Sequence, residues 1–240
     1  MARRQHRRRF VRLVDRLEVG SVIEAAAVIV AGQVRVNGVI VTNPDALVAV
    51  DAVVALVEEK VLRGTLKLRS ALGRFQAPVS GRVCLDVGAA AGGFTAALLE
   101  AGAATVYAVD VGYGQLAGWL RQDGRVVNLE RTNLADLGLR LVPEAVGVIC
   151  LDLSYLALAD AIPQLASLDL AEAAQLIALV KPTFELHASS MIVDEDVIDK
   201  AVATSKAAAE SCGWSVDERS VPVRGGGGAQ EMFIYATRPR

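Results

Sequence analysis

Four ionisable side chains stand at the edges of apolar segments, where the side chains of an α/β protein usually meet their ligands. They are Lys67 ahead of the first apolar strand, Asp152 and Lys181 at the ends of two later strands, and Glu231 at the start of the last. A single charge at a strand end is usually just solvated. Two lysines and two acids that converge on one cleft are typical of a site for proton transfer and charge stabilisation.

A glycine-rich turn lies between the first strand and the following helix. The strand ends in Leu85-Asp86-Val87 and runs into Gly88-Ala-Ala-Ala-Gly92-Gly93-Phe94. Glycines let a backbone approach a ligand closely, and Asp86 can meet a cationic amino group. The next strand ends in Asp110, 24 residues after Asp86, where a carboxylate can hold ribose hydroxyls. We expect these residues to converge, because ligands bind beyond the carboxyl ends of parallel strands.

Two cofactors fit this pattern. A dinucleotide site would have the spacing GxGxxG, with glycines against a pyrophosphate. Here the spacing is Asp-x-Gly-x-x-x-Gly-Gly, and an acid ahead of the first glycine would repel a pyrophosphate but suits an amino-acid group. The pattern therefore favours S-adenosylmethionine over a nicotinamide dinucleotide; a turn that binds nothing is the remaining interpretation. Asn133, with Glu130 and Asp136, follows the third strand and could face the adenine ring.

Strands and helices alternate in the region that carries these motifs. The patterns predict strands at 82–87, 105–109, 125–128, 146–151 and 175–180, helices at 91–100, 157–168 and 195–212, and two final strands at 214–221 and 231–237, separated by the glycine loop 225–228. Such alternation predicts an α/β fold, a mostly parallel sheet with helices on both faces. The two late strands suggest an antiparallel edge.

The first sixty residues have a different pattern and predict a small α+β unit. Ser21-Val-Ile-Glu24 is a capping box, followed by a helix to Ala31 and a stop at Gly32. Asn37-Gly38 predicts a hairpin turn between strands at 33–36 and 39–41, and a last strand covers 53–57. The expected order is helix, helix, hairpin, strand. A linker is expected near 58–64, and the first residues of the second domain, 61–66 of 61–240, are assigned to it.

Positive charge is concentrated at the N-terminus. Residues 1–60 carry nine Lys/Arg and seven Asp/Glu, and the formal charge of the whole chain is −2. Seven arginines fall in the first sixteen residues, and such a cluster attracts phosphate backbones. The alternative is a solvated, disordered tail. We take six residues of this unit as candidate RNA contacts: Arg7, Arg8, Arg9, Arg12, Arg35 and Asn37.

Composition argues against several other classes of protein. No apolar run reaches the length of about 18 residues that spans a bilayer, and no signal-peptide core follows the basic start. Cys84, Cys150 and Cys212 lack CxxC spacing, so we expect reduced thiols and a cytoplasmic location. With His6 and His187 as its only histidines, the chain offers no pattern for a His-rich metal site, and no metal is expected.

Several stretches together resemble the FtsJ-type RNA 2′-O-methyltransferases, which use a Lys-Asp-Lys-Glu tetrad. The whole chain is similar to the TlyA (hemolysin A-type) branch, which adds an N-terminal S-four-like RNA-binding domain. The stretches that carry the resemblance are Val83-Cys-Leu-Asp-Val-Gly88, Gly92-Gly-Phe-Thr95, Val106-Tyr-Ala-Val-Asp-Val-Gly-Tyr-Gly-Gln-Leu116, Leu129-Glu-Arg-Thr-Asn133, Ala178-Leu-Val-Lys-Pro-Thr-Phe-Glu185 and Val34-Arg-Val-Asn-Gly38.

The resemblance implies a Rossmann-like class I methyltransferase domain at 61–240, an S-four-like domain at 1–60, and S-adenosylmethionine-dependent methylation of ribosomal RNA, either naked or in a subunit. It makes Lys181 the base for the ribose hydroxyl. A lysine acts as a base where burial or a neighbouring cation favours its neutral form, and Lys67 could be that cation. Asp152 would orient Lys181, and Glu231 would orient Lys67 or the ribose.

The chain departs from the family pattern in three places. Thr65 replaces a glycine in Leu62-Arg-Gly-Thr-Leu-Lys-Leu68, the helix Ala25-Ala-Ala-Val-Ile-Val30 lacks the usual arginines, and Ala229-Gln230 replaces a segment with an asparagine. These departures keep open a second function, that of a non-catalytic RNA- or ribosome-binding factor with a methyltransferase fold.

Overall fold

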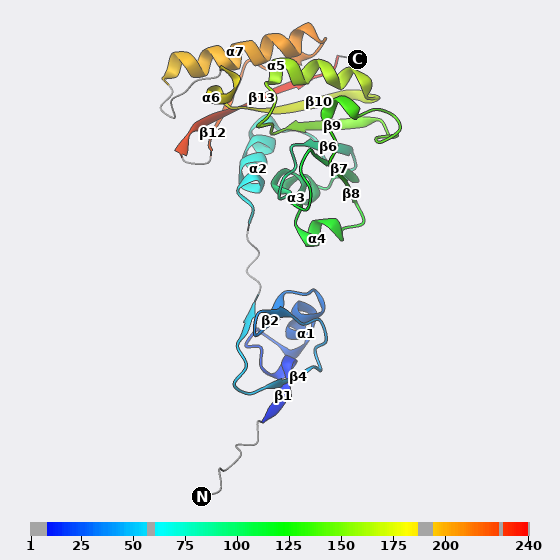
Figure 1. The fold of residues 1–240 in the computed structure, drawn as a ribbon, viewed down its shortest axis with the longest axis vertical. Coiled ribbons are helices and arrows are strands. Elements are labelled where there is room, and N and C mark those ends of the chain that lie inside the picture. The colour runs from blue at the N-terminus through cyan, green and yellow to red at the C-terminus, as the bar shows by residue number, and fades with distance from the viewer. Residues whose placement is uncertain (1–8, 57–60, 187–193, 226–227, 240) are drawn as a thin grey trace, which may run out of the picture. The chain divides into compact units, whose positions relative to one another are not determined.

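The computed structural model describes residues 9–56, 61–186, 194–225 and 228–239 (Figure 1). The chain divides into two compact units, Met1–Lys60 and Val61–Arg240. Each unit has a hydrophobic core of its own.

The large unit is built on one eight-stranded sheet. Its strand order is β11-β13-β10-β9-β6-β7-β8, and β12 also pairs with β13. The strands are β6 (Val83–Val87), β7 (Thr105–Asp110), β8 (Val126–Glu130), β9 (Val146–Leu151), β10 (Leu170–Val180), β11 (Ser215–Val216), β12 (Val221–Arg224) and β13 (Gln230–Thr237). Strands β6 to β10 pair in parallel, whereas β13 runs antiparallel to β10. The expected mostly parallel sheet with an antiparallel last strand is confirmed.

Helices cover both faces of this sheet. They are α2 (Arg63–Phe75), α3 (Gly93–Glu100), α4 (Gly118–Arg121), α5 (Leu158–Ala161), α6 (Pro182–Glu185) and α7 (Glu195–Ser211). Successive residues of the central strand β9 enter different cores: Ile149 and Leu151 pack in the cluster that includes α5 and α7, whereas Val148 and Cys150 pack in the cluster that includes α2 and α3. This alternation follows from the two-residue period of a strand and explains why β9 is apolar throughout.

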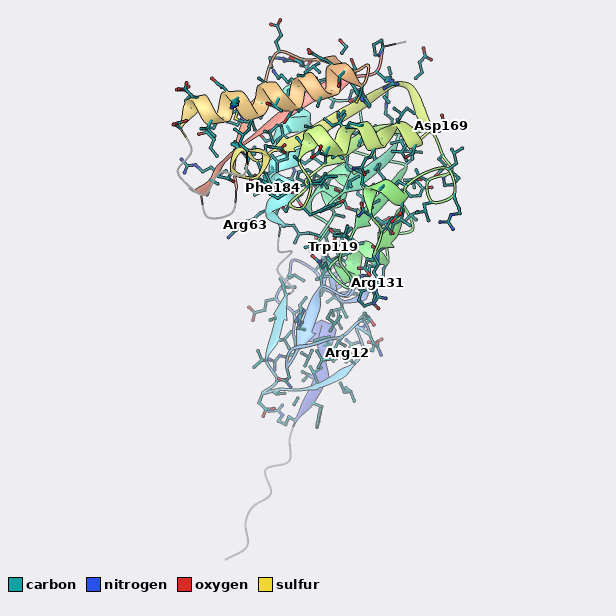
Figure 2. All side chains as sticks on the ribbon, turned by 45° about the horizontal axis from the view of Figure 1, so that its top comes forward. Arg12, Arg63, Trp119, Arg131, Asp169 and Phe184 are labelled. Carbon is teal, nitrogen blue, oxygen red and sulfur yellow. The ribbon has the colours of Figure 1, made fainter. Side chains whose placement is uncertain are left out.

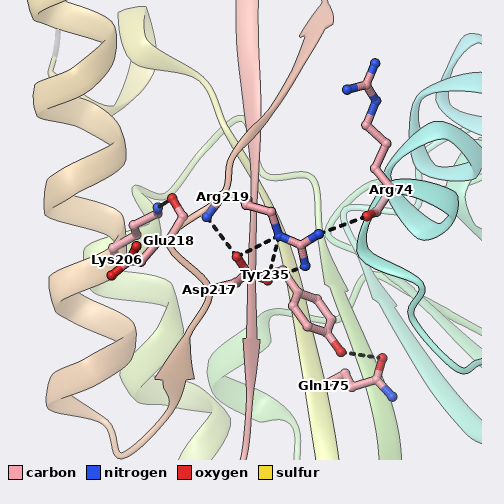
Figure 3. A network of polar contacts seen from close by, with 7 residues as sticks. All are labelled: Arg74, Gln175, Lys206, Asp217, Glu218, Arg219 and Tyr235. Carbon is pink, nitrogen blue, oxygen red and sulfur yellow. Dashed lines mark hydrogen bonds and ion pairs between the residues drawn. The ribbon is translucent and has the colours of Figure 1, made fainter.

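A polar network joins α2 to β10 and β13 (Figure 3). Arg219 pairs with Asp217 at 2.7 Å and donates a hydrogen bond to the backbone carbonyl of Arg74 at 3.5 Å. The hydroxyl of Tyr235 on β13 donates to Oε1 of Gln175 on β10 at 3.2 Å. These contacts hold the C-terminal end of α2 close to the strands at the antiparallel edge.

The segment around Lys67 is helical, which corrects the expectation of a linker at 61–66. Helix α2 begins at Arg63, and the buried positions Leu68, Leu72 and Phe75 recur at helical spacing. Phe75 stacks on Tyr235 with ring centroids 5.0 Å apart. Lys67 therefore lies on a rigid helix and not in a connecting loop.

Three other elements differ from the expected pattern. The expected helix at 157–168 ends at Ala161 and continues as a 3-10 helix (Ile162–Ser167), because Pro163 has no N–H for a helical bond. Strand β10 begins five residues earlier than expected, with a bulge at Ala173, whose φ is +53°. The expected strand at 214–221 is two strands, since Asp217 accepts from the Arg219 amide and turns the chain between them.

The small unit contains the expected capped helix and hairpin. Helix α1 (Val22–Val30) has both bonds of the Ser21–Glu24 capping box. Strands β2 (Val34–Val36) and β3 (Val39–Ile40) flank the Asn37-Gly38 turn, whose φ values of +48° and +85° are those of a two-residue hairpin loop. Strand β5 (Val54–Leu56) pairs with the other side of β2.

The expected first helix of the small unit is not formed in the described residues ahead of α1, 9–21. In its place stand β1 (Phe10–Arg12) and a 3-10 helix (Leu13–Asp15), and β1 pairs with β4 (Leu47–Ala49). The amides of Leu13 and Val14 donate to the carbonyls of Ala46 and Pro44. These long-range hydrogen bonds replace the helical ones, and no local sequence pattern predicts them.

Thr65 tethers the start of α2 to the start of α3. Its side chain is buried, and Oγ1 donates to the carbonyl oxygen of Gly93 at 2.9 Å. Gly64 and Gly93 approach so closely that a Cβ added to Gly93 would lie 2.7 Å from the Gly64 Cα. The departure from the family pattern at Thr65 is therefore accommodated by a hydrogen bond at this contact.

We expect Thr65→Val to lower the free energy of unfolding of the large unit by about 1 kcal/mol, the typical net value of one hydrogen bond. The matched control is Thr204→Val on the exposed face of α7, which should change it by less than about 0.5 kcal/mol. Urea unfolding followed by tryptophan fluorescence measures both, because Trp119 and Trp214 both lie in the large unit. Equal effects of the two substitutions would contradict a stabilising role for the Thr65 hydroxyl.

Candidate active site

The carboxyl ends of the parallel strands form the edge of the sheet at which the predicted residues gather. Strand β6 lies between β7 and β9, so the connections on its two sides leave in opposite directions. Such a switch point opens a crevice beyond the strand ends. The glycine turn follows β6, Asp110 ends β7, and Asp152 follows β9.

The glycine turn is shaped by contacts within the protein. A Cβ at Gly88 would lie 2.3 Å from the backbone oxygen of Asp152, and one at Gly92 would lie 2.1 Å from the Leu120 side chain. Gly88 and Gly92 also have positive φ angles of +87° and +94°, which favour glycine. Close packing within the chain thus accounts for the three glycines Gly88, Gly92 and Gly93. From the sequence, their expected purpose was close approach of the backbone to a ligand.

Asp110 connects the end of β7 to the glycine turn. Its Oδ2 accepts a hydrogen bond from the Ala90 amide at 2.8 Å, and its Oδ1 accepts one from the Gly112 amide at 2.7 Å. These two bonds fix the carboxylate at the edge where the ribose of a nucleoside cofactor was expected.

Asp86 is a fully buried carboxyl group at the centre of this region. Its Oδ2 accepts from the Thr95 hydroxyl at 2.6 Å, while Oδ1 has no hydrogen-bond partner within the part of the chain that the structure describes. Burial raises the pKa of Asp86 to about 7, and the nearby Asp152 and Asp110 also raise it, against the Thr95 hydrogen bond. A cationic amino group would supply the missing partner, so the residues fit the amino-acid part of S-adenosylmethionine.

Two further predicted cofactor contacts have other partners in the structure. Phe94 is buried, and its ring packs against Phe233 with centroids 5.7 Å apart, which places it in the core. Asn133 accepts a hydrogen bond from the Ala135 amide and caps the 3-10 helix Leu134–Asp136. Asn133 is exposed at the same edge as Asp110, since the amide of Thr132 donates to the Asp110 carbonyl.

Lys181 and Asp152 form the first of two ion pairs. The Nζ of Lys181 lies 2.6 Å from Oδ1 of Asp152 and donates to Oγ of Ser154 at 2.8 Å. Both side chains of the pair are largely shielded, with 18% and 25% of their surface exposed. Ser154 was not singled out from the sequence, where a serine two residues after the acid gives no specific signal.

Lys67 and Glu231 form the second ion pair. The Nζ of Lys67 on α2 donates to Oε2 of Glu231 on β13 at 2.6 Å, and 16% and 10% of the two side chains are exposed. Gly225 lies against this carboxylate, because a Cβ there would stand 2.2 Å from Oε1 of Glu231. A side chain at 225 would have to displace the Glu231 carboxylate, so the glycine keeps this ion pair in place although the neighbouring segment departs from the family pattern.

The sheet register places the two ion pairs side by side. Val180 and Met232 are the last paired residues of β10 and β13, and the next residues on the two strands are Lys181 and Glu231. Across the other edge of β10, Leu151 at the end of β9 pairs with Ala178 and leads directly to Asp152. Asp152, Lys181 and Glu231 therefore lie at the same end of the adjacent strands β9, β10 and β13. Lys67 on α2 joins them through its ion pair with Glu231.

The predicted RNA contacts of the small unit are mostly engaged within it. Arg12 pairs with Asp15 at 2.9 Å and with Asp45 at 3.4 Å, Arg35 donates to the Gly38 carbonyl, and Asn37 accepts from the Val53 amide. Arg9 is exposed. Arg7 and Arg8 lie outside the described residues.

Exposed aromatic side chains follow β7 at the cofactor edge. Tyr113 and Trp119 expose 68% and 58% of their surface, and the Arg131 guanidinium stands 4.1 Å from the centre of the Tyr113 ring. Trp119 and Arg131 project from this part of the large unit (Figure 2). Tyr113 belongs to one of the stretches that carry the family resemblance, but no sequence pattern predicts a role for any of these three side chains.

Neither a metal cluster nor a membrane span is found in the described part of the chain. Within residues 9–56, 61–186, 194–225 and 228–239, no three His, Cys, Asp or Glu side chains are grouped to hold a metal ion. None of the helices in these ranges is long and apolar enough to cross a membrane.

Comparison with known proteins gives consistent matches. The FtsJ-like methyltransferase family model matches residues 61–238. The 16S/23S rRNA (cytidine-2′-O)-methyltransferase TlyA of Mycobacterium tuberculosis is 43% identical over 188 residues, which cover 73% of this chain and 67% of the relative. The 23S rRNA (cytidine-2′-O)-methyltransferase TlyA of Campylobacter jejuni is 30% identical over 75% of this chain and 72% of its own length. A solved structure from Streptococcus thermophilus, described as a candidate hemolysin, is 30% identical, with a TM-score of 0.69 over 96% of this chain and 89% of its own.

The pKa of Asp86 leads to a prediction for the ligand-free protein. Because burial raises this pKa from 3.8 to about 7, the stability contributed by the protonated carboxyl is complete below about pH 4 and is lost as the pH rises towards 7. Asp86→Asn cannot titrate. Its free energy of unfolding should therefore exceed that of the unmodified protein by up to roughly 4 kcal/mol at about pH 8, but not at about pH 4. Urea unfolding at the two pH values measures this, and a difference independent of pH would contradict it.

Proposed function

Because the chain belongs to the FtsJ-like methyltransferase family, in its TlyA group, we propose that it methylates ribose 2′-hydroxyl groups of ribosomal RNA with S-adenosylmethionine as donor. The observation that carries this proposal is the pair of adjacent ion pairs, Lys181–Asp152 and Lys67–Glu231, at the edge of the sheet that bears the glycine turn. Such a protein would act in the cytoplasm, where ribosomes are assembled.

The donor would be held by Asp86 and Asp110, with the glycine turn between them. When bound, S-adenosylmethionine supplies a methyl group on a positively charged sulfur. The Asp86 carboxylate offers a counter-charge for an amino group, and Asp110, fixed by two backbone amides, offers oxygens to ribose hydroxyls. Asn133 is exposed beside the contact between Thr132 and Asp110 and would face the adenine ring.

Lys181 is the base in this proposal. A ribose hydroxyl is a poor acid, so its proton has to leave as its oxygen accepts the methyl group. The Nζ of Lys181 would take that proton in its neutral form. Asp152 holds the amine as an ion pair at 2.6 Å, and the hydrogen bond that the amine donates to Ser154 at 2.8 Å fixes its direction. The Asp152 carboxylate would also stand beside the ammonium that forms on Lys181.

Lys67 and Glu231 would complete the site from the opposite side of Lys181. Lys67 would add a positive charge on this side of the site, while Glu231 holds Lys67 at 2.6 Å and lies next to Lys181 in the sheet register. In this arrangement each lysine has its own acid, so neither acid has to serve both.

RNA would be held by charge and by stacking. Residues 10–56 carry three arginines and five acids, so the positive charge of the small unit resides in its first nine residues, which would contact phosphates. Tyr113, with Arg131 over its ring, and Trp119 are exposed aromatic side chains of the kind that stacks on unpaired bases. The identity of residues 1–60 as an S-four-like domain belongs to the same proposal.

The alternative is a non-catalytic RNA- or ribosome-binding factor. The apolar surface of α1, where Val22, Ile23 and Val30 are exposed, favours contacts with protein more than with RNA in that part of the small unit. The alternative leaves two shielded lysine–acid pairs at the ligand edge without a role. A binding factor would also bind S-adenosylmethionine without turnover, and the kinetic experiment below separates the two.

Substitution of Lys181 tests the catalytic proposal. Lys181→Ala should reduce single-turnover methylation of a ribosomal subunit about a hundredfold to ten-thousandfold while S-adenosylmethionine binding by calorimetry is retained. Lys181→Arg keeps the positive charge beside Asp152 but cannot release a proton near neutral pH, so it should be equally inactive. Lys200→Arg on the exposed face of α7 is the matched control and should retain full activity. An active Lys181→Arg would rule out the role of base.

Removal of residues 1–60 tests the division of labour between the units. The large unit has its own core, so the truncated protein should fold and bind S-adenosylmethionine as before. Its affinity for ribosomal RNA should fall, and the dependence of that affinity on salt should become shallower, because the arginines at the N-terminus no longer displace counterions. RNA binding across a salt series measures both. A truncated protein with unchanged RNA affinity would contradict the proposal.

A further inference from the structure

Glu185 lies on α6, the short helix that begins directly after Lys181. The amides of Phe184 and Glu185 donate to the carbonyl oxygen of Lys181 at 2.8 and 2.9 Å. Lys181 is thus the residue that caps this helix. The backbone position of Lys181 and that of Glu185 are therefore tied to each other within one turn.

The side chain of Glu185 reaches a different part of the chain. Its Oε2 accepts a hydrogen bond from the backbone amide of Leu158 at 2.9 Å, and its Oε1 lies 3.2 Å from the same amide. Leu158 is the first residue of α5, and the preceding Ala157 has no side chain able to cap the helix. Glu185 supplies from a distance an acceptor for the first of the helix amides that have no partner within the helix.

The two contacts of Glu185 close a ring around the first ion pair. The loop between β9 and α5 carries Asp152 and Ser154, and its far end is held by the Glu185 carboxylate at Leu158. The other branch of the ring runs from Glu185 through α6 to Lys181, which pairs with Asp152 at 2.6 Å. The loop with the acid and the segment with the lysine are thus joined at both ends.

The electrostatic surroundings of Glu185 agree with this position. Burial raises its pKa, and the Leu158 amide and the charge of Lys181 act in the opposite direction. The oxygens of the Glu185 carboxylate already face the start of α5, so Glu185 needs no contact with a substrate to influence Lys181.

We propose that Glu185 is a positioning residue that holds Lys181 and Asp152 in the geometry of their ion pair by capping α5 from α6. The importance of this geometry for methyl transfer rests on the proposed function. The geometry itself can be tested in the ligand-free protein, so the two proposals can fail separately.

The test compares two substitutions of similar size in the full-length protein. Glu185→Gln keeps a carbonyl oxygen that can accept from the Leu158 amide, whereas Glu185→Met has the same length without a strong acceptor. Glu195→Met, in the exposed first turn of α7, is the matched control. Competitive acylation with acetic anhydride, followed by mass spectrometry, gives the reactivity of the Lys181 amine relative to that of Lys67 in the same molecule.

In Glu185→Met the Lys181 amine should react several-fold faster relative to Lys67, because it is no longer held on Asp152 and Ser154. Glu185→Gln and Glu195→Met should match the unmodified protein. In single-turnover and steady-state methylation, Glu185→Met should lower kcat at least about tenfold, with the KM values for S-adenosylmethionine and RNA changed less than twofold, and Glu185→Gln should restore kcat.

An unchanged Lys181 to Lys67 ratio in Glu185→Met would overturn the inference, and so would a Glu185→Gln protein that behaves like Glu185→Met. If Glu185→Met does not fold, the Gln variant still decides, because it must keep both the normal ratio and the normal KM values. A raised ratio in a protein that methylates no RNA at all would support the positioning role of Glu185 and reject the proposed function.

Discussion

The antiparallel pairing of β13 with β10 is the constraint on which the candidate active site depends. Its register sets Val180 against Met232 and so brings the two following residues, Lys181 and Glu231, to the same point of the sheet. A slip of one residue would turn the Glu231 side chain to the opposite face and remove the carboxylate from Lys67. The stacking of Phe75 on Tyr235 holds α2 against β13, so that Lys67 and Glu231 meet in this register.

Close backbone contacts connect this edge to the glycine turn. Gly88 lies against the backbone of Asp152, and Gly93 lies against Gly64 just ahead of Lys67. A larger residue at Gly88 would push the glycine turn away from Asp152. A larger residue at Gly93 would push α3 away from the start of α2, which carries Lys67. The same glycines thus serve the protein's own packing and set the spacing between the glycine turn and the two ion pairs, so that a substitution at one of them would shift the groups proposed to react.

Much of the large unit could be predicted from the sequence because its signals are local. Buried parallel strands such as β9 are apolar over their whole length, and the glycine turn marks the first of them. The helix that carries Lys67 was missed, since the expected linker covered its first turn. Asp45, the second partner of Arg12, and Val53, the partner of Asn37, lie far away in the sequence. Long-range pairing of this kind leaves no periodic pattern, and the candidate RNA contacts were affected most.

The ion pair between Lys67 and Glu231 joins residues that are 164 positions apart. Along the chain, β13 is the last strand of the large sheet. Synthesis proceeds from the N-terminus, and domains can fold while the chain grows. The small unit and the parallel strands can therefore form early, but Lys67 has no carboxylate until β13 has been made and has paired with β10. A chain still being translated would lack a complete site. Its synthesis on a ribosome would therefore be separated in time from any chemistry on ribosomal RNA.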